Sequence, residues 1–241
     1  MIYPRRWISA LAGLCLVAPC VHAQEADTTT PVPRSAEGWW TKRHEEKLAQ
    51  AKEQKDQIGV IFLGDSITQG WEGGAARPTW DRFYGPRKPI DLGFSGDRTQ
   101  HVLWRLDNGE VGGLKPKVAV LMIGTNNAGS NTAEAIADGI KAVVAKIQAK
   151  LPETKVLLLA VFPRGETPDN PLREKLKKVN DLIKPLDDGK NVTYLDIGPK
   201  FLQEDGTISK EIMPDFLHLS GKGYRIWADA IEPTLWKMME N

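Results

Sequence analysis

Five short runs of β-branched and other apolar residues recur along the chain, and they constrain its fold more than any other feature. They occupy residues 58–63, 90–92, 118–123, 155–161 and 192–196. Each run is continuous rather than alternating, which is typical of strands that are buried on both faces of a parallel sheet.

Helical patterns separate these runs, at 39–55, 99–106, 132–151, 172–186 and 221–239. In the fourth of these segments, apolar residues recur at three- and four-residue steps from Leu172 to Ile183. Alternation of strands and helices predicts a single α/β domain with helices on both faces of the sheet. In such sheets, ligands bind at the carboxyl ends of the strands.

The first 23 residues differ from the rest of the chain. Two arginines, Arg5 and Arg6, precede an apolar run at 7–21, which is followed by Ala23. The run is shorter than the roughly 20 residues that cross a bilayer, so a cleaved signal peptide is favoured over a membrane anchor. We expect cleavage after Ala23 and a secreted or periplasmic protein without a membrane span.

Cleavage would remove both cysteines, Cys15 and Cys20, and with them disulfides, thiolate catalysis and cysteine-bound zinc. A twin-arginine signal at Arg5-Arg6 and lipid attachment at Cys20 are alternatives that the sequence leaves open. Residues 24–36 are rich in threonine and proline and are expected to form a flexible leader before a domain at 37–241.

The charged residues are balanced and interspersed. The chain has 32 Lys and Arg against 31 Asp and Glu, without the basic stripe that phosphate binding requires. No nucleic-acid partner is expected.

Polar residues follow the predicted strands at the edge where a ligand would bind. The four motifs are Gly64-Asp65-Ser66, Gly93-Phe94-Ser95-Gly96, Gly124-Thr125-Asn126-Asn127 and Asp215-Phe216-Leu217-His218. Taken singly, each motif is also typical of an ordinary turn or helix cap. Together they are complementary in chemistry and in place.

A serine hydroxyl needs a base, and His218 is the histidine predicted at this edge. Asp215 would hold the imidazole and stabilise its charged form. The N–H groups of Ser66 and Gly96 and the side-chain amide of Asn126 would then bind an oxyanion. A zinc site formed by His218, Asp215 and Asp97 is disfavoured, because the usual metal-binding spacing is missing.

With these four motifs the sequence resembles the SGNH (GDSL-type) hydrolases. It is most similar to the branch of platelet-activating factor acetylhydrolase catalytic subunits, through the stretches 96–106, 108–110, 163–165, 170–174, 205–209 and 217–220. The resemblance implies a flavodoxin-like α/β/α sandwich with a five-stranded parallel sheet, hydrolysis of short acyl esters, and no metal or cofactor. It assigns the nucleophile to Ser66, the acid–base pair to Asp215 and His218, and the oxyanion donors to Gly96 and Asn126. The wider family has Asn-Asp where this sequence has Asn126-Asn127. The acetylhydrolase branch shares the double Asn, so this difference favours that branch.

The substrate is predicted less sharply. Asp65, Trp71, Asn127 and Arg164 are candidates for substrate contact, and the short loops favour an open site for small acyl groups. Acetylated carbohydrates and small lipid esters both fit. A carbohydrate-binding protein without turnover, or a thioesterase or lysophospholipase with the same triad, remains an alternative, as do both a monomer and a dimer.

Overall fold

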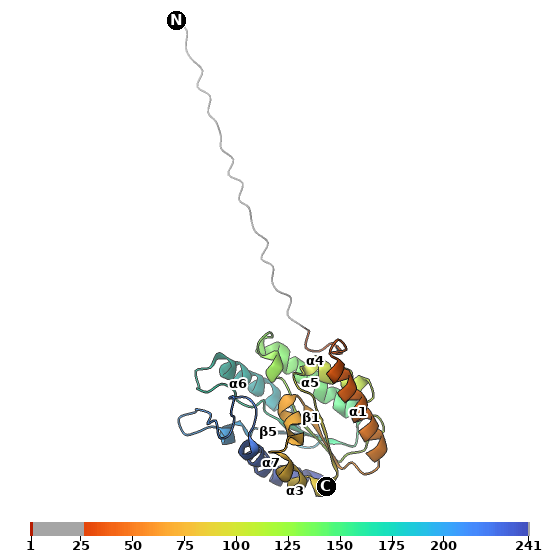
Figure 1. The fold of residues 1–241 in the computed structure, drawn as a ribbon. Helices are drawn as coiled ribbons and strands as arrows, with labels where there is room; N and C mark the ends of the chain where they lie inside the picture. Colours follow the sequence, from red (N-terminus) through yellow and green to blue (C-terminus); the bar gives the residue numbers. More distant parts are fainter. Residues whose placement is uncertain (2–26, 241) are drawn as a thin grey trace.

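The computed structural model of the chain describes Met1 and residues 27–240 (Figure 1). Apart from Met1, the predicted signal peptide with both cysteines lies outside the described residues, as do residues 24–26 of the predicted leader. Among the residues that are described, no helix combines the length and the apolar character needed to cross a membrane.

Five strands form one parallel sheet, as the apolar runs predict. They are β1 (Val60–Gly64), β2 (Pro89–Gly93), β3 (Val118–Met122), β4 (Lys155–Leu159) and β5 (Val192–Leu195), in the order β2-β1-β3-β4-β5. This order is that of flavodoxin-like folds, whose ligands bind where the connections from β1 and β3 diverge.

Helices cover both faces of the sheet and complete three layers (Figure 1). One face is covered by α1 (Gly38–Gln54), α4 (Thr99–Asp107), α5 (Ala133–Lys150) and α6 (Pro171–Ile183), the other by α3 (Arg77–Phe83) and α7 (Gly221–Glu240). Successive residues of β1 serve the two cores in turn: Leu63 packs in the first and Phe62 in the second. Both are fully buried, so the run is continuously apolar.

The segment between β1 and β2 contains helices that the sequence analysis did not predict. They are α2 (Ser66–Gln69), η1 (Gly70–Glu72), α3 and η2 (Gly85–Arg87). Pro78 stands in the first turn of α3, where a missing N–H costs no intrahelical hydrogen bond. Elsewhere, single turns occur at η3 (Thr125–Asn127), η4 (Lys184–Leu186) and η5 (Gly198–Phe201).

Residues 27–37, here called the N-terminal strap, lie against the domain and differ from the flexible leader expected for 24–36. Thr28 is buried, its hydroxyl donates to the Ala135 carbonyl (2.6 Å), and its carbonyl accepts from the Thr99 hydroxyl (2.8 Å). At Gly139 a Cβ would lie 2.9 Å from the Thr28 carbonyl oxygen, so the close approach requires glycine there. Thr28, the first residue of a threonine run that looks like low-complexity sequence, thus has specific partners in the domain.

Candidate active site

Ser66, His218 and Asp215 form a continuous hydrogen-bonded chain at the carboxyl edge of the sheet. Ser66 begins α2 directly after β1, and its Oγ lies 2.9 Å from Nε2 of His218. Nδ1 of His218 lies 2.6 Å from Oδ2 of Asp215. The structure therefore brings together the three residues predicted for nucleophilic catalysis.

The turn that carries His218 fixes this geometry. Oδ1 of Asp215 accepts the backbone N–H groups of Leu217 (3.1 Å) and His218 (2.7 Å), while Oδ2 is left for the imidazole. Partial burial acts to raise the pKa of Asp215, but hydrogen bonds from His218 outweigh it and hold that pKa below its usual range. The carboxylate thus stays charged and can stabilise an imidazolium.

The three predicted oxyanion donors follow three neighbouring strands. Ser66 follows β1, and its N–H belongs to the first turn of a helix, where such groups have no intrahelical acceptor. Gly96 follows β2 and has a φ of +73°, in the left-handed region that favours glycine. Asn126 follows β3, and its Nδ2 donates to the carbonyl of Asp97 (2.9 Å). An amide carries two N–H groups, so this bond orients the side chain with one N–H and leaves the other for an oxyanion.

A buried ionic cluster, absent from the sequence analysis, supports these loops. Asp97 is fully buried and accepts from Arg105 Nε (2.8 Å), Trp40 Nε1 (2.7 Å) and Arg34 Nη1 (3.1 Å). Its carboxylate is therefore engaged by three donors and does not face the triad as a metal ligand. From sequence, Asp97 was considered only as a possible zinc ligand, and its role in this cluster was not predicted.

Arg105 connects this cluster to the sheet. It is fully buried and donates to the carbonyls of Leu92 (3.1 Å) and Gly64 (3.3 Å), which lie at the ends of β2 and β1. It also pairs with the buried Glu110. The cluster thus holds the strand ends from which the oxyanion loop and the Ser66 turn emerge.

Comparison with known proteins agrees with this geometry. The sequence model of the GDSL-like lipase/acylhydrolase family matches residues 62–226, more than half of the chain. The chain belongs to this family. It is a carboxylic ester hydrolase.

Similar curated proteins include subunits of platelet-activating factor acetylhydrolase IB. The alpha1 subunit of platelet-activating factor acetylhydrolase IB from Bos taurus is 38% identical over 216 residues, covering 89% of this chain and 90% of its own. The alpha2 subunit from Rattus norvegicus is 41% identical over 202 residues, covering 83% and 85%. Among solved structures, a GDSL-like lipase from Bacteroides thetaiotaomicron matches with a TM-score of 0.64 at 25% identity, covering 81% of this chain and 97% of its own.

Three of the four candidate substrate contacts are buried in this GDSL-type hydrolase, which corrects the expectation from sequence. Asp65 is fully buried, and its Oδ1 accepts the Ile67 N–H (2.9 Å), which caps α2. Burial raises the pKa of Asp65 to about 7. Asn127 is also fully buried, and its side chain accepts from the Thr99 N–H (3.1 Å) and donates to Gln100 (3.2 Å). Both residues shape the loops from inside.

Trp71 is the third corrected candidate. It is fully buried in an aromatic cluster, where its ring lies 4.6 Å from Tyr224 and 5.2 Å from Trp227 between ring centroids. Arg164 alone is partly exposed at the site edge, and its Nη1 donates to the carbonyl (3.2 Å) and hydroxyl (3.1 Å) of Thr125.

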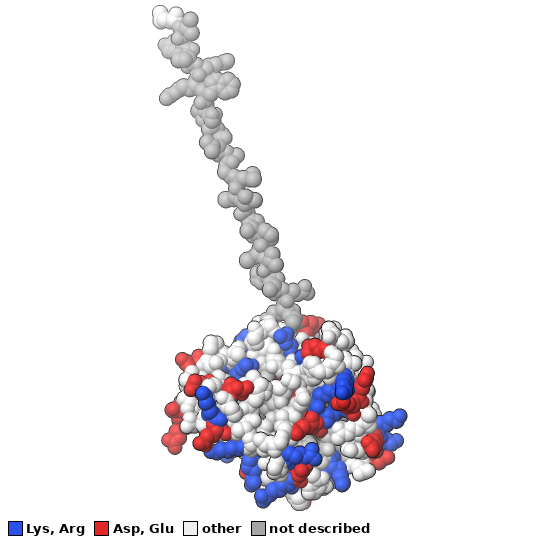
Figure 2. Space-filling model, in the orientation of Figure 1, with Lys and Arg blue, Asp and Glu red and all other residues white. Residues whose placement is uncertain are grey.

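A hollow of about 410 Å³ opens beside the nucleophile of the GDSL-type hydrolase. It is lined by Ser66, Gln69, Gly70, Glu72, Gly73 and Ser95. None of these six residues has an apolar side chain. The centre of the face seen in Figure 2 carries few charged side chains, and Lys, Arg, Asp and Glu are interspersed around it.

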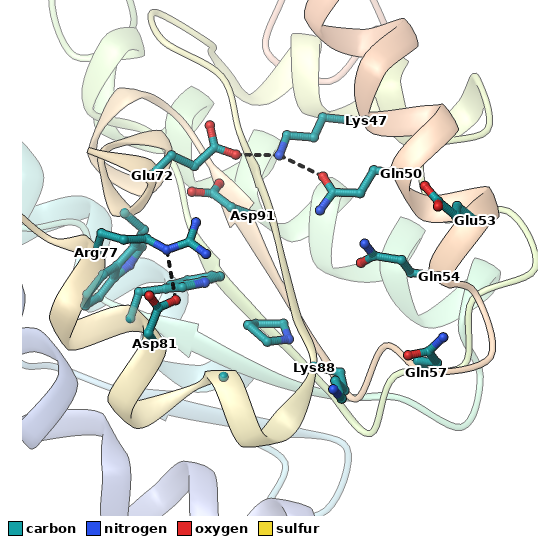
Figure 3. A pocket seen from close by; sticks show the side chains of 14 residues that line it. Lys47, Gln50, Glu53, Gln54, Gln57, Glu72, Arg77, Asp81, Lys88 and Asp91 are labelled. Atoms are coloured by element: carbon teal, nitrogen blue, oxygen red, sulfur yellow. Dashed lines mark hydrogen bonds and ion pairs between the residues drawn. The ribbon is translucent and has the colours of Figure 1, made fainter. Parts of the chain in front are cut away.

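A second pocket, of about 490 Å³, lies between α1 and α3 (Figure 3). Lys47 crosses its upper edge and pairs with Glu72 (2.5 Å) and Gln50 (3.1 Å). Glu72 is shared with the hollow beside Ser66. The residues lining this second pocket include no serine, cysteine or histidine, so it offers no nucleophile–base pair of its own.

Proposed function

We propose that this GDSL-type hydrolase is an exported serine esterase that removes acetyl groups from hydroxyl-rich substrates, above all acetylated carbohydrates. The chemistry depends on one observation, the unbroken chain from the Ser66 hydroxyl through His218 to the Asp215 carboxylate. The choice of substrate is supported by the residues that line the hollow beside Ser66, none of which has an apolar side chain.

The reaction has two steps. His218 Nε2 takes the proton of Ser66 as its oxygen attacks the ester carbonyl, and Asp215 stabilises the imidazolium. The oxyanion is bound by the N–H groups of Ser66 and Gly96 and by the Asn126 amide. His218 then protonates the leaving alcohol, and water repeats the cycle on the acyl-enzyme.

The polar lining favours a hydroxylated alcohol over an alkyl chain. A long acyl or alkyl chain is bound by burying apolar surface, which requires apolar side chains in the wall of the site. The hollow offers hydroxyl, amide, carboxylate and glycine backbone groups instead. These groups match the hydroxyls of a sugar ring.

A small acetylated lipid is the second candidate, favoured by the names of the curated relatives, platelet-activating factor acetylhydrolase IB subunits. A rate comparison separates the two. We expect kcat/KM to be higher for acetylated xylooligosaccharides than for a 2-acetyl ether phospholipid, and to fall as p-nitrophenyl esters lengthen from acetyl to octanoyl. A higher kcat/KM for the phospholipid would make the acetylated lipid the favoured substrate in place of acetylated carbohydrates.

Export is tested separately. The basic pair, apolar run and Ala23 at the start of the sequence support it. When the full chain is expressed in a bacterium, we expect the protein outside the cytoplasm, with Gln24 as its first residue by mass spectrometry. An unprocessed cytoplasmic chain would contradict export and leave the esterase proposal untouched.

A further inference from the structure

Arg34, in the N-terminal strap, contacts the loop that carries the Gly96 oxyanion donor. Its Nη1 donates to the carbonyl oxygen of Ser95 (2.6 Å) and to Oδ1 of Asp97 (3.1 Å). Its Nε and Nη2 donate to the Glu37 carboxylate (2.9 and 2.7 Å), which holds the guanidinium in place. The side chain is 16% exposed, so the contact is partly shielded from water.

The carbonyl that Arg34 holds and the N–H that would bind the oxyanion belong to the same peptide unit. The Ser95 C=O and the Gly96 N–H lie in one plane and, in a trans peptide, point in opposite directions. The peptide bonds of the described residues are all trans. Fixing the carbonyl from the strap side therefore fixes the direction of the N–H on the other side.

The charge of Arg34 adds to this effect. A hydrogen bond from a charged donor is stronger than a neutral one, and it polarises the peptide so that its N–H becomes a better donor. Gln69 also holds this loop, because its side-chain oxygen accepts the Ser95 N–H (2.7 Å), but it brings no charge.

Glycine at position 96 and arginine at position 34 fit as a pair. A Cβ at position 96 would lie 3.1 Å from both Nη1 and Nη2 of Arg34, closer than such contacts normally are. The guanidinium thus lies directly against the backbone of residue 96.

From these contacts we propose that Arg34 is a positioning residue for the oxyanion hole, acting through the Ser95–Gly96 peptide, and that the N-terminal strap is part of the active site. The proposal rests on the proposed function only in requiring acyl transfer from Ser66, and not on the identity of the alcohol. Because the oxyanion exists only in the transition state and intermediate, losing Arg34 should lower kcat and leave KM nearly unchanged.

The test compares Arg34→Ala, Arg34→Gln and Arg34→Lys in the mature chain with p-nitrophenyl acetate as substrate. We expect kcat to fall about 10- to 100-fold in Arg34→Ala, less than for direct loss of a donor, with Arg34→Lys retaining the most activity. Added guanidinium ion should restore part of kcat in Arg34→Ala at an unchanged melting temperature. A merely structural role would give no such rescue.

Arg77→Ala is the matched control, because Arg77 forms an exposed ion pair with Asp81 on α3. It should keep the wild-type kcat. Should Arg34→Ala fail to fold, Arg34→Lys and Arg34→Gln, compared at equal folded fraction, replace it. An unchanged kcat in the substituted proteins, or a loss of kcat that guanidinium does not reverse, would overturn the proposal. Failure of the proposed function would give different results: a wild-type protein without esterase activity, or a Ser66→Ala protein with full activity.

Discussion

The Ser66 hydroxyl oxygen lies 2.9 Å from Nε2 of His218, although the two residues are 152 positions apart in the sequence. The sheet makes this contact possible: Ser66 follows the central strand β1, and the turn of His218 precedes α7, which packs against the same face as Phe62 of β1. A hydroxyl placed this close to an imidazole, itself 2.6 Å from a carboxylate, has a general base within hydrogen-bonding distance.

Replacing Ser66 with alanine should abolish ester hydrolysis while preserving the fold. The substitution removes one oxygen at a partly exposed position, so the melting temperature should change little. We expect p-nitrophenyl acetate turnover to fall by at least about 10⁴-fold, together with loss of covalent labelling by a fluorophosphonate. The wild-type rate should persist in EDTA, because no step uses a metal. Retained turnover in Ser66→Ala would remove Ser66 as nucleophile.

Replacing Asn126 with alanine should lower kcat and spare KM. The Asn126 amide is held by the Asp97 carbonyl (2.9 Å) and has a second N–H for the oxyanion. Loss of one such donor costs about 10²- to 10³-fold in kcat. Asn108→Ala is a suitable control, since the Asn108 amide is exposed and donates to the Trp104 carbonyl within the same helix end (2.8 Å). Equal rates in the two variants would exclude Asn126 from the oxyanion hole.

The sheet and the triad could be predicted from sequence because their signals are local. A strand buried on both faces requires a continuous apolar run, and the polar residues of Gly64-Asp65-Ser66 come immediately after such a run. Long-range packing could not be predicted in this way. Nothing near Arg34 in the sequence indicates that it contacts Ser95, 61 positions later, because that contact depends on the path of the strap across α4 and α5.

Trp71 illustrates the same limit within a single turn. It lies five residues after Ser66, and from sequence it is a candidate for substrate contact. The direction of its side chain is set by η1, which turns the ring inward against Tyr224 and Trp227. An exposed or a buried tryptophan at this position would look the same in sequence.

Replacing Trp71 should therefore reduce stability rather than substrate binding. Trp71→Ala would leave a large cavity in a fully buried aromatic cluster and should cost about 3–5 kcal/mol in the free energy of unfolding. Trp71→Phe, which keeps an aromatic ring, should cost less and allow kinetics on folded protein. Urea denaturation measures the loss of stability, and KM for acetylated oligosaccharides measured on folded Trp71→Phe tests whether substrate binding changes. A raised KM in fully folded Trp71→Phe would restore Trp71 as a substrate contact.

Asp91 should make the protein less stable as the pH rises toward 8. It lies on β2 behind the Glu72–Lys47 pair, 3% exposed (Figure 3), and its Oδ2 has no hydrogen-bond partner among the described residues. Burial, reinforced by the Glu72 carboxylate, raises the pKa of Asp91 from its ordinary 3.8 to about 8. The folded protein therefore holds a proton that the unfolded chain has released, throughout the window between these two values.

In that window the unfolded state binds fewer protons at Asp91, so the free energy of unfolding falls with rising pH, by at most about 1.4 kcal/mol per unit. Below pH 3.8 both states are protonated and the effect vanishes, whereas above pH 8 the loss is complete. Asp91→Asn removes the titration, so its stability relative to wild type should rise steadily between pH 5 and pH 8 in urea denaturation. A constant difference between wild type and Asp91→Asn across this range would mean that Asp91 is ionised in the folded protein.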